Sequence, residues 1–477
     1  MLWWRVYEPD APELAVDTTT SNSLARGSVV GEIARTRVSG GVLIDVPAHQ
    51  LRDRVESTAE ALARRAPVIY EASFMADDVF VSVDILEHRR RGFVLTEVKS
   101  TLDVKEPHIP DVAVQLHVVR RAGLPVHRVE VMHLNRKCEH PDLSNLFVRE
   151  NVTRLAEEER RRVPRRARSL LAALRGPLPE VETGPHCTTP YECPFITRCW
   201  PKLPKHHVST LYRISKKRLG VAIAAGYETL RDLPSDFVEP GPAARQVASV
   251  KRCKVVVEPK LGDALDGIDG PIAFLDFETV MPAIPTWPGC RPYEQVPVQL
   301  SCHVIDQPDS KRTTHHAWLA DGPGDPRRAF AHALIAACKG VRTILAYNAS
   351  FERQRINSLA GALPDLAGRL ARIGEQVLDL LTLVRDHVYH PDFGGSFSIK
   401  QVLPALVPGM GYGDLEIADG GIASAALEQL LLSGETMTRP ERQTLRKNLL
   451  AYCERDTLAM VKLWHRLRHL AQGAREG

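Results

Sequence analysis

Three side chains in the N-terminal part of the chain could bind a divalent cation and assist a hydrolysis. Asp84 lies in the segment VSVDIL, and Glu97 and Lys99 lie in LTEVKS. Because Glu97 and Lys99 are two residues apart, both point to the same face of an extended strand. Two carboxylates can bind a hard cation such as Mg²⁺, and a lysine can orient or deprotonate water, or stabilise charge developing on phosphorus. This is the chemistry of phosphodiester hydrolysis, although an E-x-K pair alone is more often a solvated strand.

The neighbouring segments favour the chemical interpretation. Asp84 and Glu97 interrupt apolar runs, where an unpaired charge is costly, and Gln115 lies in the apolar segment VAVQLHVV. Alternating residues predict strands in VFVSVDIL and FVLTEVKS, joined by the turn EHRRRG. A helix through DVAVQLHVVRRAG and a strand VHRVEVMHL follow. The order of strand, strand, helix and strand predicts an α/β unit.

A second group of acidic residues lies in the C-terminal part of the chain. Asp276 and Glu278 are two apart in the apolar segment FLDFETV, so they share one face of a strand. Glu352 follows in LAYNASFERQRI, and Tyr452 and Asp456 lie one helical turn apart in YCERD. Four such carboxylates could bind two metal ions about 4 Å apart. The D-x-E pair taken alone would fit a solvated strand equally well.

These acidic residues need a second α/β unit to position them. Strands are predicted in PIAFLDFETV, VPVQLSCHVI, HHAWLA and TILAYNA, with helices in RRAFAHALIAACKG, in SFERQRINSLA and in the last long segment from Arg439. The stretch before about residue 270 is rich in Pro, Gly and Asp and is the best linker candidate. We therefore expect domains at 1–205 and 266–470, with a helical hairpin and linker at 206–265.

The N-terminal motifs resemble the PD-(D/E)xK nucleases of the RecB-like type, and the matching residues are Asp84, Glu97, Lys99 and Gln115. The resemblance implies a restriction-endonuclease-like fold. RGSVVGEIAR (26–35) resembles the first-helix motif of that family and makes Glu32 a further metal ligand. Gly31 stands where many relatives have histidine, which affects the expected metal preference. Glu71, in VIYEASF, is open to either of two interpretations, an additional ligand or a solvated strand end.

The C-terminal motifs resemble the RNase H-like exonucleases of the DEDD type, and residues 270–466 resemble the family called domain of unknown function 2779. The resemblance implies a mixed sheet with flanking helices, catalysis by the four acids, and a water-orienting Tyr452. Asn348 and Phe351 match the second exonuclease motif, but Glu352 replaces its usual aspartate. The longer side chain implies slow catalysis, altered metal preference or binding alone. Three polar residues of GSFSIKQVLPAL could contact phosphates, and Asp379 could be a supporting acid; the three are Ser396, Ser398 and Lys400.

Three of the nine cysteines, Cys187, Cys193 and Cys199, are evenly spaced in one Pro-rich segment. They lack the C-x2-C spacing usual for zinc. In RecB-like nucleases of this type such cysteines bind a 4Fe-4S cluster with a fourth cysteine near the N-terminus, ahead of an aromatic stretch like the LWW at residues 2–4. That fourth cysteine is missing here, and we expect it upstream of Met1; Cys138 and His186 are the alternatives within the chain.

Composition is that of an ordinary globular protein, with 477 residues, 44% hydrophobic and 25% charged, and a net charge of +4. No apolar run is long enough to span a membrane, and the N-terminus does not read as a secretory signal, so we expect a cytoplasmic protein. Two basic segments are ambiguous. An arginine-rich run could track a nucleic-acid backbone or be a solvated face paired with Glu157–Glu159, and residues 215–218 with Gly226 weakly resemble a helix–hairpin–helix. The arginines of the first segment are Arg160, Arg161, Arg162, Arg165, Arg166 and Arg168.

We therefore expect a nuclease that depends on Mg²⁺ or Mn²⁺, with two candidate sites and nucleic acid, favouring DNA, as its partner. The alternative is a nucleic-acid-binding scaffold whose C-terminal domain has lost catalysis. A redox or zinc protein built on the three cysteines is a third, less favoured hypothesis.

Overall fold

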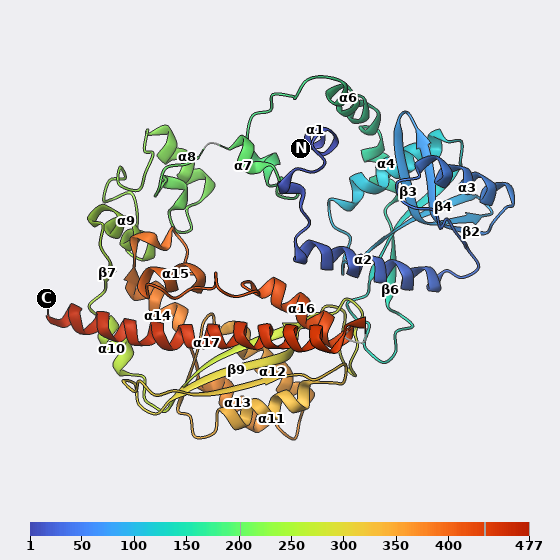
Figure 1. Cartoon of the computed structure of the whole chain (residues 1–477). Helices are drawn as coiled ribbons and strands as arrows, with labels where there is room; N and C mark the ends of the chain where they lie inside the picture. The colour runs from blue at the N-terminus through green and yellow to red at the C-terminus, as the bar shows by residue number, and fades with distance from the viewer. Residues whose placement is uncertain (201, 434–435, 477) are drawn as a thin grey trace. The chain divides into compact units, whose positions relative to one another are not determined.

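A computed structural model describes residues 1–200, 202–433 and 436–476, with only the backbone described at 18, 19 and 476. The chain divides into two compact units (Figure 1). The first comprises Met1–Pro201 and Pro282–Glu294, and the second comprises Lys202–Met281 and Gln295–Gly477. Each unit combines helices with a sheet of mixed strand direction, so the α/β prediction is confirmed. Within the described residues, no helix combines the length and apolarity that a membrane crossing requires.

The first unit contains a six-stranded sheet in sequence order. The predicted hairpin is present, because β2, β3 and β4 are antiparallel neighbours. The next strand, β5, runs parallel to β4, as a helical crossover requires. The strands are β1 (Val42–Leu43), β2 (Val68–Ala76), β3 (Val79–Arg89), β4 (Gly92–Lys99), β5 (Val126–Leu134) and β6 (Phe147–Asn151).

Helices cover both faces of this sheet. On one face, α4 places Val112 and Leu116 against Val83 and Leu95, all fully buried. On the other face, Ala34 of α2 packs among side chains from β2, β3 and β5. The helices of this unit are α1 (Leu2–Tyr7), α2 (Thr18–Arg37), α3 (Leu51–Ala63), α4 (His108–Arg121), α5 (Thr153–Arg160), α6 (Val163–Arg175) and α7 (Ile196–Cys199), with 3-10 turns η1 (Pro12–Leu14) and η2 (Pro185–Cys187).

The second unit contains a five-stranded sheet in the order β10-β9-β8-β11-β12. Its first three strands are antiparallel, whereas β11 and β12 run parallel to β8. A two-stranded pair, β7 and β13, lies apart from this sheet. The strands are β7 (Val256–Val257), β8 (Ile272–Val280), β9 (Val296–Ile305), β10 (Thr314–Leu319), β11 (Thr343–Ala346), β12 (Val377–Asp379) and β13 (Val388–Tyr389).

The central strand β8 alternates its side chains between two hydrophobic cores. Phe274 faces the long helix α17 and meets Trp464, with ring centroids 6.5 Å apart. Leu275 and Phe277 face the opposite side, which α11, α12 and α13 cover (Figure 1). The helices are α8 (Lys216–Ala224), α9 (Pro242–Arg252), α10 (Leu261–Asp266), α11 (Arg327–Ala337), α12 (Ser350–Ala362), α13 (Ala367–Gln376), α14 (Leu380–His387), α15 (Ile399–Leu406), α16 (Gly420–Leu432) and α17 (Arg439–Glu476), with 3-10 turns η3 (Val208–Thr210) and η4 (Pro391–Phe393).

Two segments differ from the sequence-based expectation. The expected linker before residue 270 contains α9 and α10, and Val247 and Val250 of α9 are buried in a small core with Leu230 and Leu233. The two valines lie three residues apart on one face of the helix, and this packing orders the segment. The residues between β8 and β9, 282–294, belong to the first unit, where Ala283 packs with Leu134.

Two candidate acidic sites

Three carboxylates form a row across β2, β3 and β4 of the first unit. Tyr70 pairs with Ile85 and Ala72 with Val83, so the register places Glu71 opposite Asp84. This pair is absent from the ladder because Glu71 has a left-handed backbone, with φ of 58°. Pairing between β3 and β4 reaches Ile85 and Thr96 at this end, and the next position would place Asp84 opposite Glu97.

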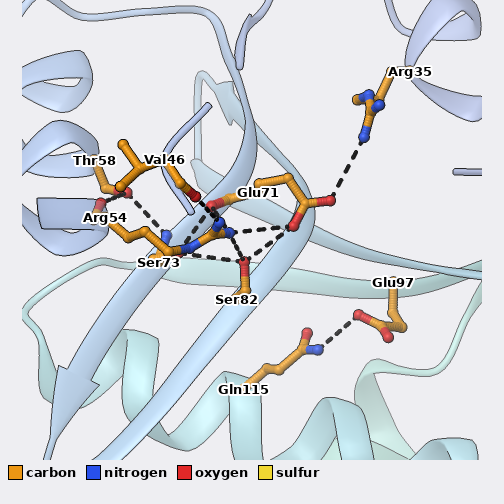
Figure 2. A network of polar contacts seen from close by, with 9 residues as sticks. All are labelled: Arg35, Val46, Arg54, Thr58, Glu71, Ser73, Ser82, Glu97 and Gln115. Atoms are coloured by element: carbon orange, nitrogen blue, oxygen red, sulfur yellow. Dashed lines mark hydrogen bonds and ion pairs between the residues drawn. The ribbon is translucent and has the colours of Figure 1, made fainter. Parts of the chain in front are cut away.

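Hydrogen bonds fix the four residues that the sequence predicted for this site. Asp84 accepts a bond of 2.6 Å from the backbone N–H of Val98. Lys99 lies between two carboxylates, 2.7 Å from Glu97 and 2.5 Å from Asp111. Gln115 of α4 donates a 2.7 Å bond to the second oxygen of Glu97 (Figure 2). The structure therefore brings Asp84, Glu97, Lys99 and Gln115 together.

A buried arginine holds Glu71 in its left-handed conformation. Arg54 of α3 is 8% exposed and lies 3.4 Å from the Glu71 carboxylate. Its guanidinium also donates to Ser73 and Ser82, and to the backbone oxygen of Val46 (Figure 2). Glu71 is thus an internal strand residue rather than a solvated strand end.

Glu71 is also linked to the first-helix motif. Arg35 of α2 approaches the other oxygen of Glu71, at 3.6 Å (Figure 2). Glu32 lies one turn before Arg35 on the same helix and is exposed. Among the described residues, no hydrogen bond or ion pair joins Glu32 to Asp84 or Glu97. Its role as a ligand therefore stays a prediction.

The electrostatics of this site separate the acids from the lysine. Burial, followed by repulsion from Glu97, raises the pKa of Asp84 well above its usual value. Burial also raises the pKa of Glu97, against the attraction of Lys99. Burial by itself would lower the pKa of Lys99, but Glu97 and Asp111 more than offset it and raise that pKa. Lys99 is therefore a cation at neutral pH, which suits charge stabilisation better than proton abstraction.

The second acidic site forms where β8 faces α17. Asp276 and Glu278 lie on the face of β8 that Phe274 shares, and Asp456 projects from α17. One oxygen from each of these three carboxylates lies within 4.8 Å of the others. The buried thiol of Cys453 lies 3.5 Å from Asp276. The alternation of β8 and the length of α17 together bring these distant segments to one place.

Glu352 reaches the same site from the first turn of α12. Its side chain is 3% exposed, and among the described residues no hydrogen-bond partner lies near its Oε2 atom. A cavity of about 360 Å³ is lined by Glu352 together with Asp276, Glu278 and Asn348. A buried carboxylate oxygen without a donor is costly, and a cation in this cavity would satisfy it. Glu352 thus points to the site despite its extra methylene.

Asp379 positions the turn that leads to Glu352. Asn348 has a left-handed backbone, with φ of 71°. The Asp379 carboxylate accepts a 3.0 Å bond from the Asn348 backbone N–H and another from Leu381 at the start of α14. Asn tolerates this conformation better than most residues. The acid predicted as a supporting residue therefore caps a helix and orders a turn.

Tyr412, which the sequence analysis missed, contacts the second site. Its hydroxyl donates a 2.5 Å hydrogen bond to Asp456. Lys400 lies 5.8 Å from the centre of the Tyr412 ring and donates to Asp419 at 2.9 Å. Tyr412 lies in an irregular Gly-rich segment without periodicity, so nothing in the sequence indicated its role. Ser396 and Ser398, the other predicted phosphate contacts, bond to one another at the start of α15.

The crowded carboxylates of the second site hold protons more tightly than usual. Burial, followed by repulsion from Asp456, raises the pKa of Glu278 to about 8, and burial raises that of Glu352 to about 8. Burial raises the pKa of Asp456 to about 6, although hydrogen bonds from Tyr412 and Tyr452 lower it. Burial, followed by repulsion from Asp456, Glu278 and Glu352, raises the pKa of Asp276 well above its usual value. This donor set fits divalent cations, which would relieve the repulsion.

The three evenly spaced cysteines line one apolar cavity of about 510 Å³ in the first unit. Trp3, Trp4 and His186 line the same cavity. The backbone N–H of Cys193 donates to the oxygen of Cys187 at 2.8 Å, which folds the segment back on itself. Three thiols at one cavity fit three of the four ligands of an iron–sulfur cluster. Cys138, the other alternative ligand, is buried with Leu134 and Leu146.

Three arginines of the first basic segment form ion pairs with nearby glutamates. Arg160 contacts Glu157 at 3.0 Å, and Arg162 and Arg166 both contact Glu159. These contacts favour the solvated-face interpretation. The segment forms two helices, because α5 ends at Arg160 and α6 begins at Val163. Residues 215–218 begin α8, where the Ser215 side chain caps the helix.

Comparison with known families identifies part of the second unit. A family model described as Domain of unknown function (DUF2779) matches residues 273–398. A DUF2779 domain is found there. The DUF2779 match contains Asp276, Glu278 and Glu352, whereas Tyr452 and Asp456 lie beyond its end. No curated protein and no solved structure matches the chain.

Proposed function

We propose that this protein is a nuclease that depends on Mg²⁺ or Mn²⁺ and hydrolyses phosphodiester bonds, with DNA as the favoured substrate. The observation that carries the proposal is the convergence of Asp276, Glu278 and Asp456, whose oxygens lie within 4.8 Å of one another. The unpartnered oxygen of Glu352 at the adjoining cavity strengthens it. A mixed sheet with helices on both faces is also what an RNase H-like domain would have.

At the second site, Asp276, Glu278, Glu352 and Asp456 would hold the metal ions. Such ions polarise a phosphate and lower the pKa of a bound water. Tyr452 lies one turn from Asp456 on α17 and would orient the attacking water. Tyr412 fixes the Asp456 carboxylate by its hydrogen bond. The buried setting would strengthen every charge interaction at the reacting phosphate.

At the first site, Asp84 and Glu97 would hold the metal, with Glu71 the third acid of the row. Gln115 donates to one oxygen of Glu97 and Lys99 to the other, so that carboxylate is fixed from two sides. Lys99 would remain charged and would stabilise negative charge on the phosphate, the electrostatic role expected of a cation at such a centre. We propose that this unit is a RecB-like PD-(D/E)xK nuclease domain.

We also propose that Cys187, Cys193 and Cys199 bind an iron–sulfur cluster. All three line the same cavity, and His186 is the described residue at that cavity that could be a fourth ligand. Thiolates would supply the bonds to iron. Trp4 packs against Phe195 of the cysteine segment, with ring centroids 5.0 Å apart, and would shield the cluster from water.

The experiment that tests the nuclease proposal compares Asp276→Asn with the matched control Asp309→Asn. Asp309 is an aspartate of the same unit, paired with Arg468 at 2.7 Å. Digestion of end-labelled single-stranded DNA in Mn²⁺ should be lost in Asp276→Asn and kept in Asp309→Asn. Retained DNA binding without digestion by wild type would instead support the scaffold alternative.

A further inference from the structure

Two histidines and a glutamate meet beside the sheet of the second unit, outside the carboxylate group described above. His303 of β9 and His315 of β10 pair directly across the ladder. Their rings stack with centroids 4.3 Å apart and an interplanar angle of 18°. Glu454 projects from α17, with its carboxylate 3.7 Å from Nδ1 of His315. One donor atom from each of the three residues lies within 4.8 Å of the others.

A chain of hydroxyl groups contacts one nitrogen of each imidazole. The Thr457 hydroxyl lies 3.1 Å from the backbone oxygen of Glu454. It also lies 2.7 Å from the Ser301 hydroxyl and 2.8 Å from Nδ1 of His303. The Ser301 hydroxyl in turn lies 3.0 Å from Nε2 of His315. Each imidazole is thus anchored through one nitrogen.

This anchoring leaves Nε2 of His303 and Nδ1 of His315 as the ring nitrogens that could bind a metal. Hydrogen bonds that fix the tautomer and orientation of a histidine are the usual surroundings of a metal-bound imidazole. Burial lowers the pKa of His303 to about 4, so its ring is neutral and able to bind a metal at neutral pH. Glu454 adds a carboxylate that is half exposed and free to adjust its position.

We propose that His303, His315 and Glu454 form a zinc site that joins α17 to the edge of the sheet. Two imidazoles and one carboxylate are a ligand set that zinc prefers, whereas Mg²⁺ prefers oxygen alone. Zinc ligands at about 2.1 Å from the metal lie about 3.4 Å from one another. The observed spacing, up to 4.8 Å, therefore requires the three side chains to close. It also requires one of the two stacked rings to turn, so that the in-plane lone pairs can meet at one metal ion.

The site would stabilise the helix that carries Tyr452 and Asp456. Glu454 and Thr457 lie on α17 between and beside those residues. A zinc ion held by both the helix and β9–β10 would oppose separation of α17 from the sheet. This role is structural and does not depend on whether the carboxylate group hydrolyses nucleic acid.

The test measures zinc bound per chain after chelation, exposure to Zn²⁺ and removal of the excess. The full chain is compared with His315→Gln, Glu454→Gln and the matched control His316→Gln, an exposed histidine on the next position of β10. We expect His315→Gln and Glu454→Gln each to bind one zinc ion fewer than wild type. His316→Gln should bind as much as wild type. Zinc bound at the cysteines or at the other acidic residues is common to all four proteins, so it does not affect the difference between them.

A second readout uses thermal unfolding with and without Zn²⁺. A metal that binds only the folded state raises the unfolding midpoint with its concentration. The rise should be present in wild type and His316→Gln and smaller in Glu454→Gln, whose half-exposed side chain can be replaced without disturbing the core. Equal zinc content and an equal rise in all four proteins would overturn the proposal.

Discussion

The hydroxyl of Tyr412 donates a hydrogen bond of 2.5 Å to the carboxylate of Asp456. The two residues lie far apart in sequence, one in an irregular segment after α15 and the other on α17. One carboxylate oxygen of Asp456 lies within 4.8 Å of oxygens of Asp276 and Glu278. The hydrogen bond also helps to lower the pKa of Asp456, which burial raises to about 6.

Tyr412→Phe should weaken metal binding at the second site without unfolding the protein. Loss of the hydrogen bond raises the pKa of Asp456 further and frees its carboxylate to rotate. We expect the Mn²⁺ concentration for half-maximal digestion to rise about tenfold, equivalent to about 1.4 kcal/mol. Tyr227→Phe, near Phe237 in the small helical core of the same unit, is the matched control. An unchanged Mn²⁺ dependence in Tyr412→Phe would contradict this role.

Glu352 should make the metal-free protein less stable as pH rises from 6.5 to 8. Its folded pKa is raised to about 8, against an ordinary value of 4.5. The folded state therefore binds more protons than the unfolded state in this range, and stability falls as the proton leaves. The loss from this one group should be about 1.5 kcal/mol. Histidines titrate near the lower end of this window, and Glu278, whose pKa is also raised to about 8, titrates within it, so a variant is needed to isolate Glu352.

Glu352→Gln removes that titration and identifies its source. The denaturation midpoint, measured in chelator at both pH values, should fall less in Glu352→Gln than in wild type. Adding Mn²⁺ to wild type should also flatten the dependence, since a cation replaces the proton. A pH dependence that is the same in Glu352→Gln and wild type would show that another group is responsible.

Arg54→Met should destabilise the first unit and disturb its acidic row. The substitution leaves Ser73, Ser82 and the Glu71 carboxylate without their buried donor. The expected cost is about 2 kcal/mol, in the range for an unsatisfied buried polar group. Arg64→Met is the control, because Arg64 is exposed and its contact with Glu60 lies on the surface. Stability is read from denaturant unfolding.

A second substitution tests whether Glu71 accounts for part of that cost. In the Arg54→Met background, Glu71→Gln removes the carboxylate charge that Arg54 balanced. Part of the lost stability should return. If the double variant is no more stable than Arg54→Met, the cost arises from packing or from the serines alone.

The chemistry-bearing residues were predicted from sequence where they lie on regular elements. Asp84, Glu97, Asp276 and Glu278 interrupt alternating apolar strands, and that interruption is visible without a structure. Tyr412 could not be predicted, since it reaches Asp456 from an irregular segment. The left-handed backbone of Glu71, with φ of 58°, was equally hidden, because nothing in VIYEASF marks it.

Long-range packing was the other feature that sequence could not supply. The segment around α9 was expected to be a linker because it is rich in Pro, Gly and Asp, yet Val247 and Val250 are buried against residues of the preceding segment. Likewise, 282–294 lies between two strands of the second unit but belongs to the first. Both placements depend on partners distant in the chain.

Anaerobic purification should give a coloured protein if the cysteines bind a cluster. Cys193→Ser should lose the visible absorbance and the bound iron, since one of the three thiolates at the cavity is removed. Cys253→Ser, an exposed cysteine outside that cavity, should keep both. Wild type purified anaerobically with zinc and no iron would contradict the cluster.

The most direct test of the two-site account is digestion by two single variants and their combination. Wild type, Asp84→Asn, Asp276→Asn and the double variant are assayed on end-labelled single- and double-stranded DNA and RNA, with Mg²⁺ or Mn²⁺. The account predicts that each single variant loses a different metal-dependent activity, and that the folded double variant loses both. Digestion by the double variant at the rate of wild type would contradict it.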